Sequence, residues 1–365
     1  MKTGTVTVVI PVYKAERWIA ETLTSAVRQT YTDLEILVVD DGSPDNSALI
    51  VEEFCRQDSR IRLIHNENGG VSSARNRGLE EAEGEFFAPL DADDLWHPDK
   101  LRLQVEAFRN AGPEAGLVYC WCSAIDEEGD ILRRDAGMSH TEGDVLLDLI
   151  MAGWMPSGSI PLFRTSAIRS IGGYLTSLTR SEDIDLYLRI AERATFLAVK
   201  QFLVGYRQHS SNTSGDAAGM VQQYERVMRS LRSRLPEIPA KLIRWSVANH
   251  RFHYGLMALR AREFGTAAWL LATALRRDPL LLERVPAILG RRMKDRVRHP
   301  GTDVDGDLKG SRFLHQKPTA GIPKTQDPDR WTRRKAGLSR KLGRGSRRFP
   351  GGPRSGGAVT VGTLR

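Results

Sequence analysis

Two aspartates separated by one small residue, Asp91-Ala92-Asp93, directly follow a stretch at residues 85–90 that is apolar from Phe86 on. Hard carboxylate oxygens at this spacing can hold Mg²⁺ or Mn²⁺ against a substrate diphosphate. The alternative is an acidic turn that caps a helix before Pro98. An EF-hand loop is excluded, because its sixth position is Trp96 instead of glycine and its twelfth is Arg102 instead of glutamate.

Two other acidic groups also have two interpretations. Asp40-Asp41-Gly42-Ser43 follows residues 35–39, and its carboxylates could accept hydrogen bonds from a nucleobase or ribose, although Asp-Gly turns are common. Glu182-Asp183-Ile184-Asp185 opens a predicted helix, whose dipole favours acidic residues in the first turn. The functional alternative is that Asp183 is a general base facing a cleft.

Arg75 and His209 are the remaining candidates. Arg75 is either a surface charge or a contact to an anion or a base inside a cleft. His209 is either an ordinary loop histidine or a third metal ligand, with a neutral imidazole that complements Asp93.

The elements that must position these residues alternate between strand and helix over the first hundred residues. Continuous β-branched and apolar runs predict buried strands of a mostly parallel α/β sheet at residues 6–10, 35–39, 61–64 and 85–90. Ligands bind outside the carboxyl ends of such strands. Three polar clusters lie at these ends: residues 11–13, 40–41 and 91–94. We therefore expect them to share one site.

The rest of the chain divides by composition. Residues 100–215 mix helical patterns with short strands, and residues 219–293 are almost entirely helical in pattern. Beyond Pro300, Gly, Pro, Ser and Arg dominate, which predicts a disordered tail. We expect a catalytic domain at residues 1–215, a helical extension at 216–299 and the tail at 300–365.

The net charge of +8 is concentrated in that tail. Residues 300–365 carry 15 basic and 5 acidic side chains, a balance of +10, which leaves −2 for the first 299 residues. The charge therefore does not predict a specific nucleic-acid partner. A solvated tail is the default for such a basic run, and contact with an anionic membrane surface is the functional alternative.

Three cysteines, Cys55, Cys120 and Cys122, do not suffice for a disulfide framework or a structural zinc site. No targeting segment stands out, and no stretch is long and apolar enough to span a membrane. These features predict a cytoplasmic protein, with peripheral contact at the inner face of the membrane as the role left open for the tail.

Seven short motifs in register resemble the family 2 glycosyltransferases, which have a GT-A fold and use nucleotide-sugar donors. The resemblance covers about residues 5–215. Lys14 departs from it, since asparagine is frequent after the tyrosine. The motifs are Val8-Val9-Ile10-Pro11-Val12-Tyr13, Leu37-Val38-Val39-Asp40-Asp41-Gly42-Ser43, Asn68-Gly69-Gly70-Val71 with Ala74-Arg75-Asn76-Arg77-Gly78, Leu90-Asp91-Ala92-Asp93-Asp94, Gly172-Gly173-Tyr174, Glu182-Asp183-Ile184-Asp185-Leu186 and Tyr206-Arg207-Gln208-His209.

The resemblance implies a role for each candidate. Asp93 would ligate Mg²⁺ or Mn²⁺, and Asp91 would lie near both the ribose and the metal. His209 would be a further metal ligand, a role that a histidine has in only some relatives. Asp183 would be the catalytic base. The positions that would bind the nucleotide-sugar are Pro11, Tyr13, Asp41, Arg75 and Asp91.

We therefore expect an inverting transferase that moves a sugar from a UDP- or other NDP-sugar to a hydroxyl of a glycan or lipid-linked acceptor. Residues 154–157 could line the acceptor side. The alternative is a non-catalytic sugar-nucleotide-binding protein that its basic tail tethers to a membrane or polyanion. The presence of Asp91, Asp93 and Asp183 favours the enzyme.

Overall fold

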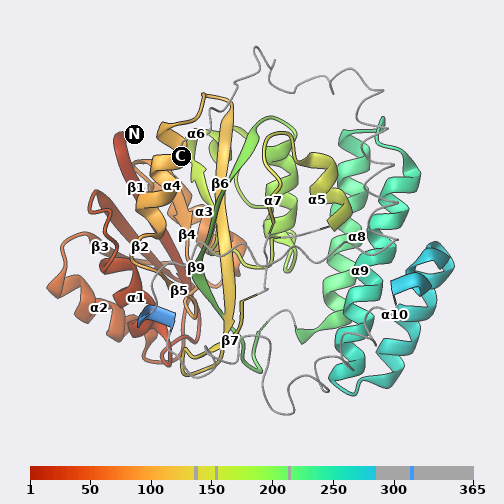
Figure 1. The fold of residues 1–365 in the computed structure, drawn as a ribbon. Helices are drawn as coiled ribbons and strands as arrows, with labels where there is room; N and C mark the ends of the chain where they lie inside the picture. The colour runs from red at the N-terminus through yellow and green to blue at the C-terminus, as the bar shows by residue number, and fades with distance from the viewer. Residues whose placement is uncertain (135–138, 153–154, 213–214, 285–312, 316–365) are drawn as a thin grey trace.

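The computed structural model describes residues 1–134, 139–152, 155–212, 215–284 and 313–315. Within that part of the chain, nine strands form one sheet in the order β3-β2-β1-β4-β8-β6-β9-β5, with β7 beside β6 (Figure 1). The strands are β1 (Lys2–Val12), β2 (Leu34–Asp40), β3 (Ile61–His65), β4 (Gly84–Pro89), β5 (Leu95–Trp96), β6 (Ala115–Ile125), β7 (Ile131–Arg133), β8 (Leu162–Arg164) and β9 (Thr195–Arg207).

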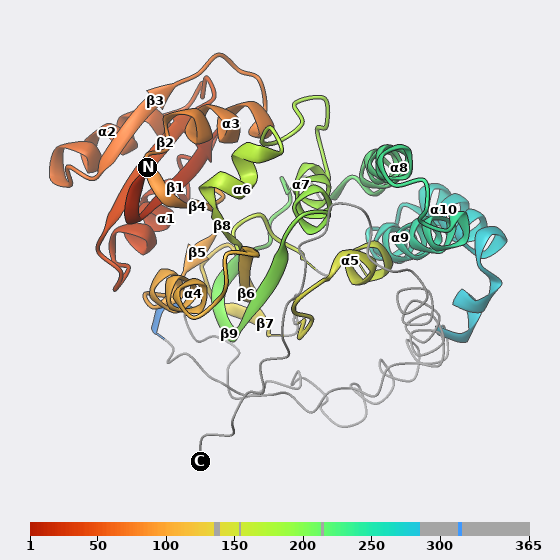
Figure 2. The same cartoon turned by 90° about the horizontal axis from the view of Figure 1, so that it is seen from above.

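Helices cover this sheet and extend beyond it (Figure 2). They are α1 (Ile19–Val27), α2 (Ser47–Gln57), α3 (Val71–Glu81), α4 (Lys100–Arg109), α5 (Leu146–Ala152), α6 (Thr165–Ser170), α7 (Glu182–Ala191), α8 (Ala217–Arg234), α9 (Ala240–Arg260) and α10 (Phe264–Arg277), with the short 3-10 helices η2 (Pro279–Arg284) and η3 (Phe313–His315).

The first four strands confirm the predicted parallel sheet. β1 lies between β2 and β4 and is parallel to both, and β2 is parallel to β3. Register pairs Val12 with Asp40, so the carboxyl ends of β1 and β2 meet at one edge. The chain leaves β4 toward Asp91 at the same edge, because Val9 pairs with Pro89. The three polar clusters therefore converge as expected.

The second half of the sheet includes strands that the sequence did not predict. β8 is antiparallel to β4 and β6, and β9 runs parallel to β6 and antiparallel to β5. The pairing of β5 with β9 matters for the site, since β5 follows Asp93 and β9 leads to His209. Lys200 and Gln201 interrupt the apolar pattern of β9, and its register with β6 shifts near Trp121.

The predicted helical extension is described as far as Arg284 and is helical. Helices α8 and α10 both pack on α9, and α5 of the preceding segment contacts α9 as well. No helix in the described part is long and apolar enough to cross a bilayer. Most of the tail predicted to be disordered lies outside the described residues. Within the tail the structure describes η3, whose Phe313 packs against Leu95 and Ile131.

The packing of α3 on β1 depends on Gly78. A Cβ at this position would lie 2.4 Å from Val9 Cγ1 and 2.8 Å from Val9 Cγ2. Real Cβ atoms do not approach so closely, and the Val9 side chain is completely buried. The absent side chain of Gly78 therefore lets the helix that carries Arg75 lie close to the central strand.

We predict that Gly78→Ala lowers the free energy of unfolding by about 2 kcal/mol, because it overpacks a buried contact. Chemical denaturation measures this change. Gly265→Ala is the control, since a Cβ at that position would have no neighbour within 4 Å and alanine favours helix. Equal stabilities of the two variants would contradict the close packing.

Candidate active site

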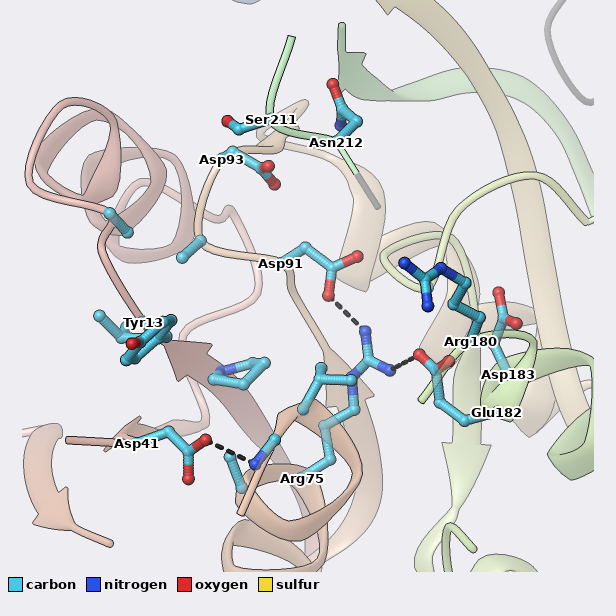
Figure 3. A pocket seen from close by; sticks show the side chains of 18 of the residues that line it. Tyr13, Asp41, Arg75, Asp91, Asp93, Arg180, Glu182, Asp183, Ser211 and Asn212 are labelled. Atoms are coloured by element: carbon cyan, nitrogen blue, oxygen red, sulfur yellow. Dashed lines mark hydrogen bonds and ion pairs between the residues drawn. The ribbon is translucent and has the colours of Figure 1, made fainter. Parts of the chain in front are cut away.

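One cavity of about 720 Å³ lies at the edge of the sheet where β1, β2 and β4 end (Figure 3). All eight residues that the sequence singled out line this cavity, although they come from positions far apart in the chain. They are Pro11, Tyr13, Asp41, Arg75, Asp91, Asp93, Asp183 and His209. The cavity is therefore the candidate active site.

At one end of the cavity Asp41 organises the loop before α3. Its Oδ1 accepts hydrogen bonds from Asn66 Nδ2 at 2.8 Å and the Gly69 N–H at 3.0 Å, and its Oδ2 accepts from the Gly70 N–H at 2.7 Å. Its side chain is buried. In this structure Asp41 thus shapes a wall of the cavity, and its contact with a nucleobase stays a prediction.

Tyr13 and Lys14 follow β1 at the same end. Tyr13 is 48% exposed, and Lys14 Nζ lies 5.2 Å from the centroid of its ring. Lys14 has a φ of 54°, in the left-handed region that asparagine adopts more readily than lysine. Lysine in place of the more frequent asparagine therefore adopts this backbone conformation at a cost in conformational free energy.

The floor of the cavity is a buried ion cluster around Arg75. Its Nη2 lies 2.5 Å from Asp91 Oδ1 and its Nη1 lies 2.8 Å from Glu182 Oε1 (Figure 3). Gly158 leaves room for this approach, because a Cβ there would lie 2.8 Å from Arg75 Nη2. The guanidinium thus joins the loop after β4 to the start of α7. Its contact with a nucleotide stays a prediction.

The residue before this helix has an unusual backbone. Ser181 has a φ of 58°, and for a residue other than glycine this conformation is uncommon and concentrated at functional sites. The next two residues, Glu182 and Asp183, both line the cavity. Asp183 Oδ1 accepts a hydrogen bond from the Ile184 N–H at 2.7 Å, which orients the carboxylate.

Two carboxyl groups of the floor hold their protons more tightly than usual. Burial, together with the negative charge of Glu182, raises the pKa of Asp183 to about 7, although the positive charge of Arg75 acts in the opposite direction. Burial also raises the pKa of Asp91, again against the effect of Arg75. An aspartate with a pKa near neutrality can both accept and release a proton under physiological conditions.

Asp93 and His209 meet at the other end of the cavity. His209 Nε2 lies 2.8 Å from Asp93 Oδ2, and His209 Nδ1 lies 2.7 Å from Ser211 Oγ. The imidazole also stacks on Trp18, with ring centroids 4.2 Å apart. Ser211 and Trp18 thus fix the ring orientation, as outer contacts usually do for an imidazole that ligates a metal, and Nε2 is directed at Asp93.

This pair fits a divalent metal that takes its remaining ligands from elsewhere. A carboxylate and an imidazole are suitable donors for Mn²⁺, and Mg²⁺ commonly keeps waters and substrate phosphates among its ligands. Among the described residues, no three His, Cys, Asp or Glu side chains form a metal-binding group. Of the three predicted ligands, Asp93 and His209 therefore come together, whereas Asp91 engages Arg75.

Sequence reasoning missed two buried residues that hold this end of the site. Asp94 accepts hydrogen bonds from the Arg207 N–H at 3.0 Å and from Ser157 Oγ at 2.9 Å. Arg207 Nε donates to the Asp93 carbonyl at 2.7 Å, and its Nη2 pairs with Glu21 at 2.7 Å. Both residues belong to the recognised motifs, but only the pairing of β5 with β9 shows that they meet.

The cavity is also lined by residues of the segment predicted for the acceptor and by one residue of the helical extension. Pro156 and Ser157 line it, whereas Trp154 lies outside the described residues. Met220 of α8 and Arg180 also line it, and Arg180 pairs with Asp216 at 3.0 Å. The sequence contains no motif that pointed to these two.

Comparison with known proteins shows similarity to one family of glycosyltransferases. The family model of glycosyl transferase family 2 matches residues 7–169. Over 250 residues the chain is 28% identical to an uncharacterized glycosyltransferase of Rickettsia typhi, an alignment that covers 68% of this chain and 77% of that protein. The chain is similar to glycosyl transferase family 2 over residues 7–169. It is also 28% identical to chondroitin synthase of Escherichia coli over 209 residues, 57% of this chain and 30% of the synthase.

Solved structures show the same GT-A fold. Residues 1–349 of Staphylococcus aureus TarS in complex with UDP-GlcNAc superpose with a TM-score of 0.56 at 19% identity, covering 87% of this chain and 100% of that one. The mannosyltransferase PcManGT from Pyrobaculum calidifontis, in complex with GDP-Man and Mn²⁺, gives a TM-score of 0.51 at 22% identity, covering 74% of this chain and 79% of that one.

We predict that Arg75→Met lowers the free energy of unfolding by about 3–5 kcal/mol, because it leaves Asp91 and Glu182 without their buried partner. The control is Arg77→Met on the same helix, whose pairs with Glu80 and Glu81 lie at the surface and contribute at most about 1 kcal/mol in total. Urea denaturation compares them. If Arg75→Met lowered the free energy of unfolding no more than Arg77→Met does, the Arg75 cluster would not stabilise the fold.

Proposed function

We propose that this glycosyltransferase transfers a sugar from a nucleoside-diphosphate sugar to an acceptor hydroxyl of a glycan or lipid-linked molecule, with inversion at the anomeric carbon. The observation that carries the proposal is the position of Asp183, which lines the cavity on the other side of the Arg75 guanidinium from Asp93 (Figure 3). We also propose that residues 1–215 form the catalytic unit.

The donor would occupy the cavity from Tyr13 to His209. Its base would lie against the exposed Tyr13 ring near Asp41, and its diphosphate would lie beside Asp93 and His209. The complexes of TarS with UDP-GlcNAc and of PcManGT with GDP-Man and Mn²⁺ support a nucleotide-sugar donor and a divalent metal. When bound between Asp93 and His209, Mg²⁺ or Mn²⁺ would stabilise the negative charge of the departing diphosphate.

Asp183 would act on the acceptor. Its carboxylate accepts the proton of the acceptor hydroxyl as that oxygen forms a bond to the anomeric carbon. The bond between the anomeric carbon and the diphosphate oxygen breaks in the same step, and its electron pair leaves with the nucleoside diphosphate. The attack comes from the face opposite to the leaving group, which inverts the configuration. The raised pKa of Asp183 makes it a stronger base than an exposed aspartate.

We predict that Asp183→Asn lowers kcat by about 10²–10⁴-fold, because an amide does not take up the proton. Donor binding, measured by isothermal titration with UDP and Mn²⁺, should stay within about twofold of the parent. In the parent protein kcat should rise as pH rises through about 7, since the base acts in its deprotonated form. Normal turnover by Asp183→Asn would refute the assignment.

We further predict that Asp93→Ala removes most of the gain in UDP affinity that Mn²⁺ provides, because His209 would be the one remaining protein ligand. Titration of UDP with and without Mn²⁺ measures that gain. Asp99→Ala serves as the control, since Asp99 precedes α4 outside the cavity lining and its side chain pairs with Arg102. An undiminished Mn²⁺ effect in Asp93→Ala would count against the metal site.

A further inference from the structure

Helix α10 is apolar around most of its circumference although it lies at the surface. Residues 264–275 contain no charged side chain. Ala267, Leu270 and Ala274 face inward and are buried. Figures 1 and 2 both show α10 in the helical layer, on the side of α9 away from the sheet. A helix without a polar face is normally buried on every side, so among the described residues this one has a face with no packing partner.

That face carries large exposed side chains. Phe264 is 66% exposed and Trp269 is 51% exposed, with the exposed Ala268 and Ala272 on the arc between them. We call these four residues the α10 surface. Trp269 also contacts Arg251, whose guanidinium lies 4.8 Å from the ring, and this contact holds the indole in place.

Neighbouring segments extend the apolar character. Leu259 at the end of α9 and Leu282 in η2 are both about half exposed. Among the described residues, four of the nine exposed large hydrophobic side chains therefore lie within residues 259–282. Helix α8 of the same layer differs, because its exposed positions include Arg226, Arg229 and Arg232. Exposed apolar residues that gather in this way mark an interaction surface.

The charge around the α10 surface identifies the partner. Residues 217–284 carry 12 basic and 5 acidic side chains, a balance of +7, whereas residues 1–216 have a balance of −13. Exposed arginines stand at both ends of α10: Arg260 and Arg262 before it and Arg276 in its last turn. The same arginines would repel one another if two copies paired through this face. The partner is therefore anionic as well as apolar.

We propose that the α10 surface docks on an anionic lipid bilayer. The 14 residues of α10 measure about 21 Å, shorter than the roughly 30 Å hydrocarbon core, so the helix lies in the interface instead of crossing it. Phe264 and Trp269 enter the boundary between headgroups and acyl chains, and the flanking arginines reach lipid phosphates. This docking would keep the catalytic cavity next to a membrane whatever acceptor the enzyme uses.

Co-sedimentation with vesicles tests the proposal on the full chain. The parent should bind vesicles of phosphatidylcholine and phosphatidylglycerol in equal parts, bind pure phosphatidylcholine weakly, and lose affinity as salt rises. Phe264→Ser combined with Trp269→Ser should lower the partition coefficient on the order of tenfold. Leu49→Ser combined with Leu132→Ser, which removes exposed leucines elsewhere, should change it little.

Circular dichroism and binding of UDP with Mn²⁺ verify that each double variant is folded, and neither readout depends on lipid. Unchanged vesicle binding by Phe264→Ser with Trp269→Ser would overturn the proposal and assign the contact to another part of the chain. Absence of vesicle binding by the parent would overturn it too. So would a parent dimer that this double variant converts to a monomer in sedimentation velocity without vesicles.

Discussion

The Arg75 guanidinium holds the site together, because it is shared by carboxylates from two distant parts of the chain. Asp91 reaches it from the edge of the parallel sheet and Glu182 from the first turn of α7. A buried cation needs both partners, since desolvation of an unpaired charge would destabilise the fold. The cluster therefore fixes Asp183 relative to the loop that carries Asp93. Burial and the negative charges of Glu182 and Asp91 also raise the pKa of Asp183. The residues that stabilise the fold here are therefore the ones that adjust the pKa of the proposed base.

A second buried cluster, around Asp94 and Arg207, holds the opposite side of the cavity. It ties the loop after β4 to the end of β9, and Arg207 bonds the carbonyl of Asp93 itself. Asp93 and His209 then approach one another because their backbones are anchored on both sides. The geometry of the metal-binding pair thus depends on groups that would touch neither metal nor substrate, as is common around metal sites.

The sequence predicted the parallel half of the fold well, because β1, β2 and β4 are continuous buried runs whose carboxyl ends carry polar residues. It also singled out eight residues that line the cavity, whereas Asp94, Arg207 and Glu182 stand in the same motifs and were not assigned to the site. It did not predict β9, whose apolar pattern is interrupted, and therefore gave no means of pairing Asp94 with Arg207. The sequence did not predict the partners of Arg75 either. Glu182 lies 107 positions away, and its contact with Arg75 depends on how α7 packs. Single-residue patterns do not encode such long-range pairs.

The stereochemistry of the product tests the central claim most directly. If Asp183 deprotonates an acceptor that attacks from the side opposite to the diphosphate, the transferred sugar must have the anomeric configuration opposite to that in the donor. Proton NMR of the product gives this configuration from the coupling of the anomeric proton, because the new glycosidic bond does not mutarotate. Inversion is the expected result. A product that retains the donor configuration would contradict the role of Asp183, because a single displacement across the Arg75 cluster could not produce that outcome.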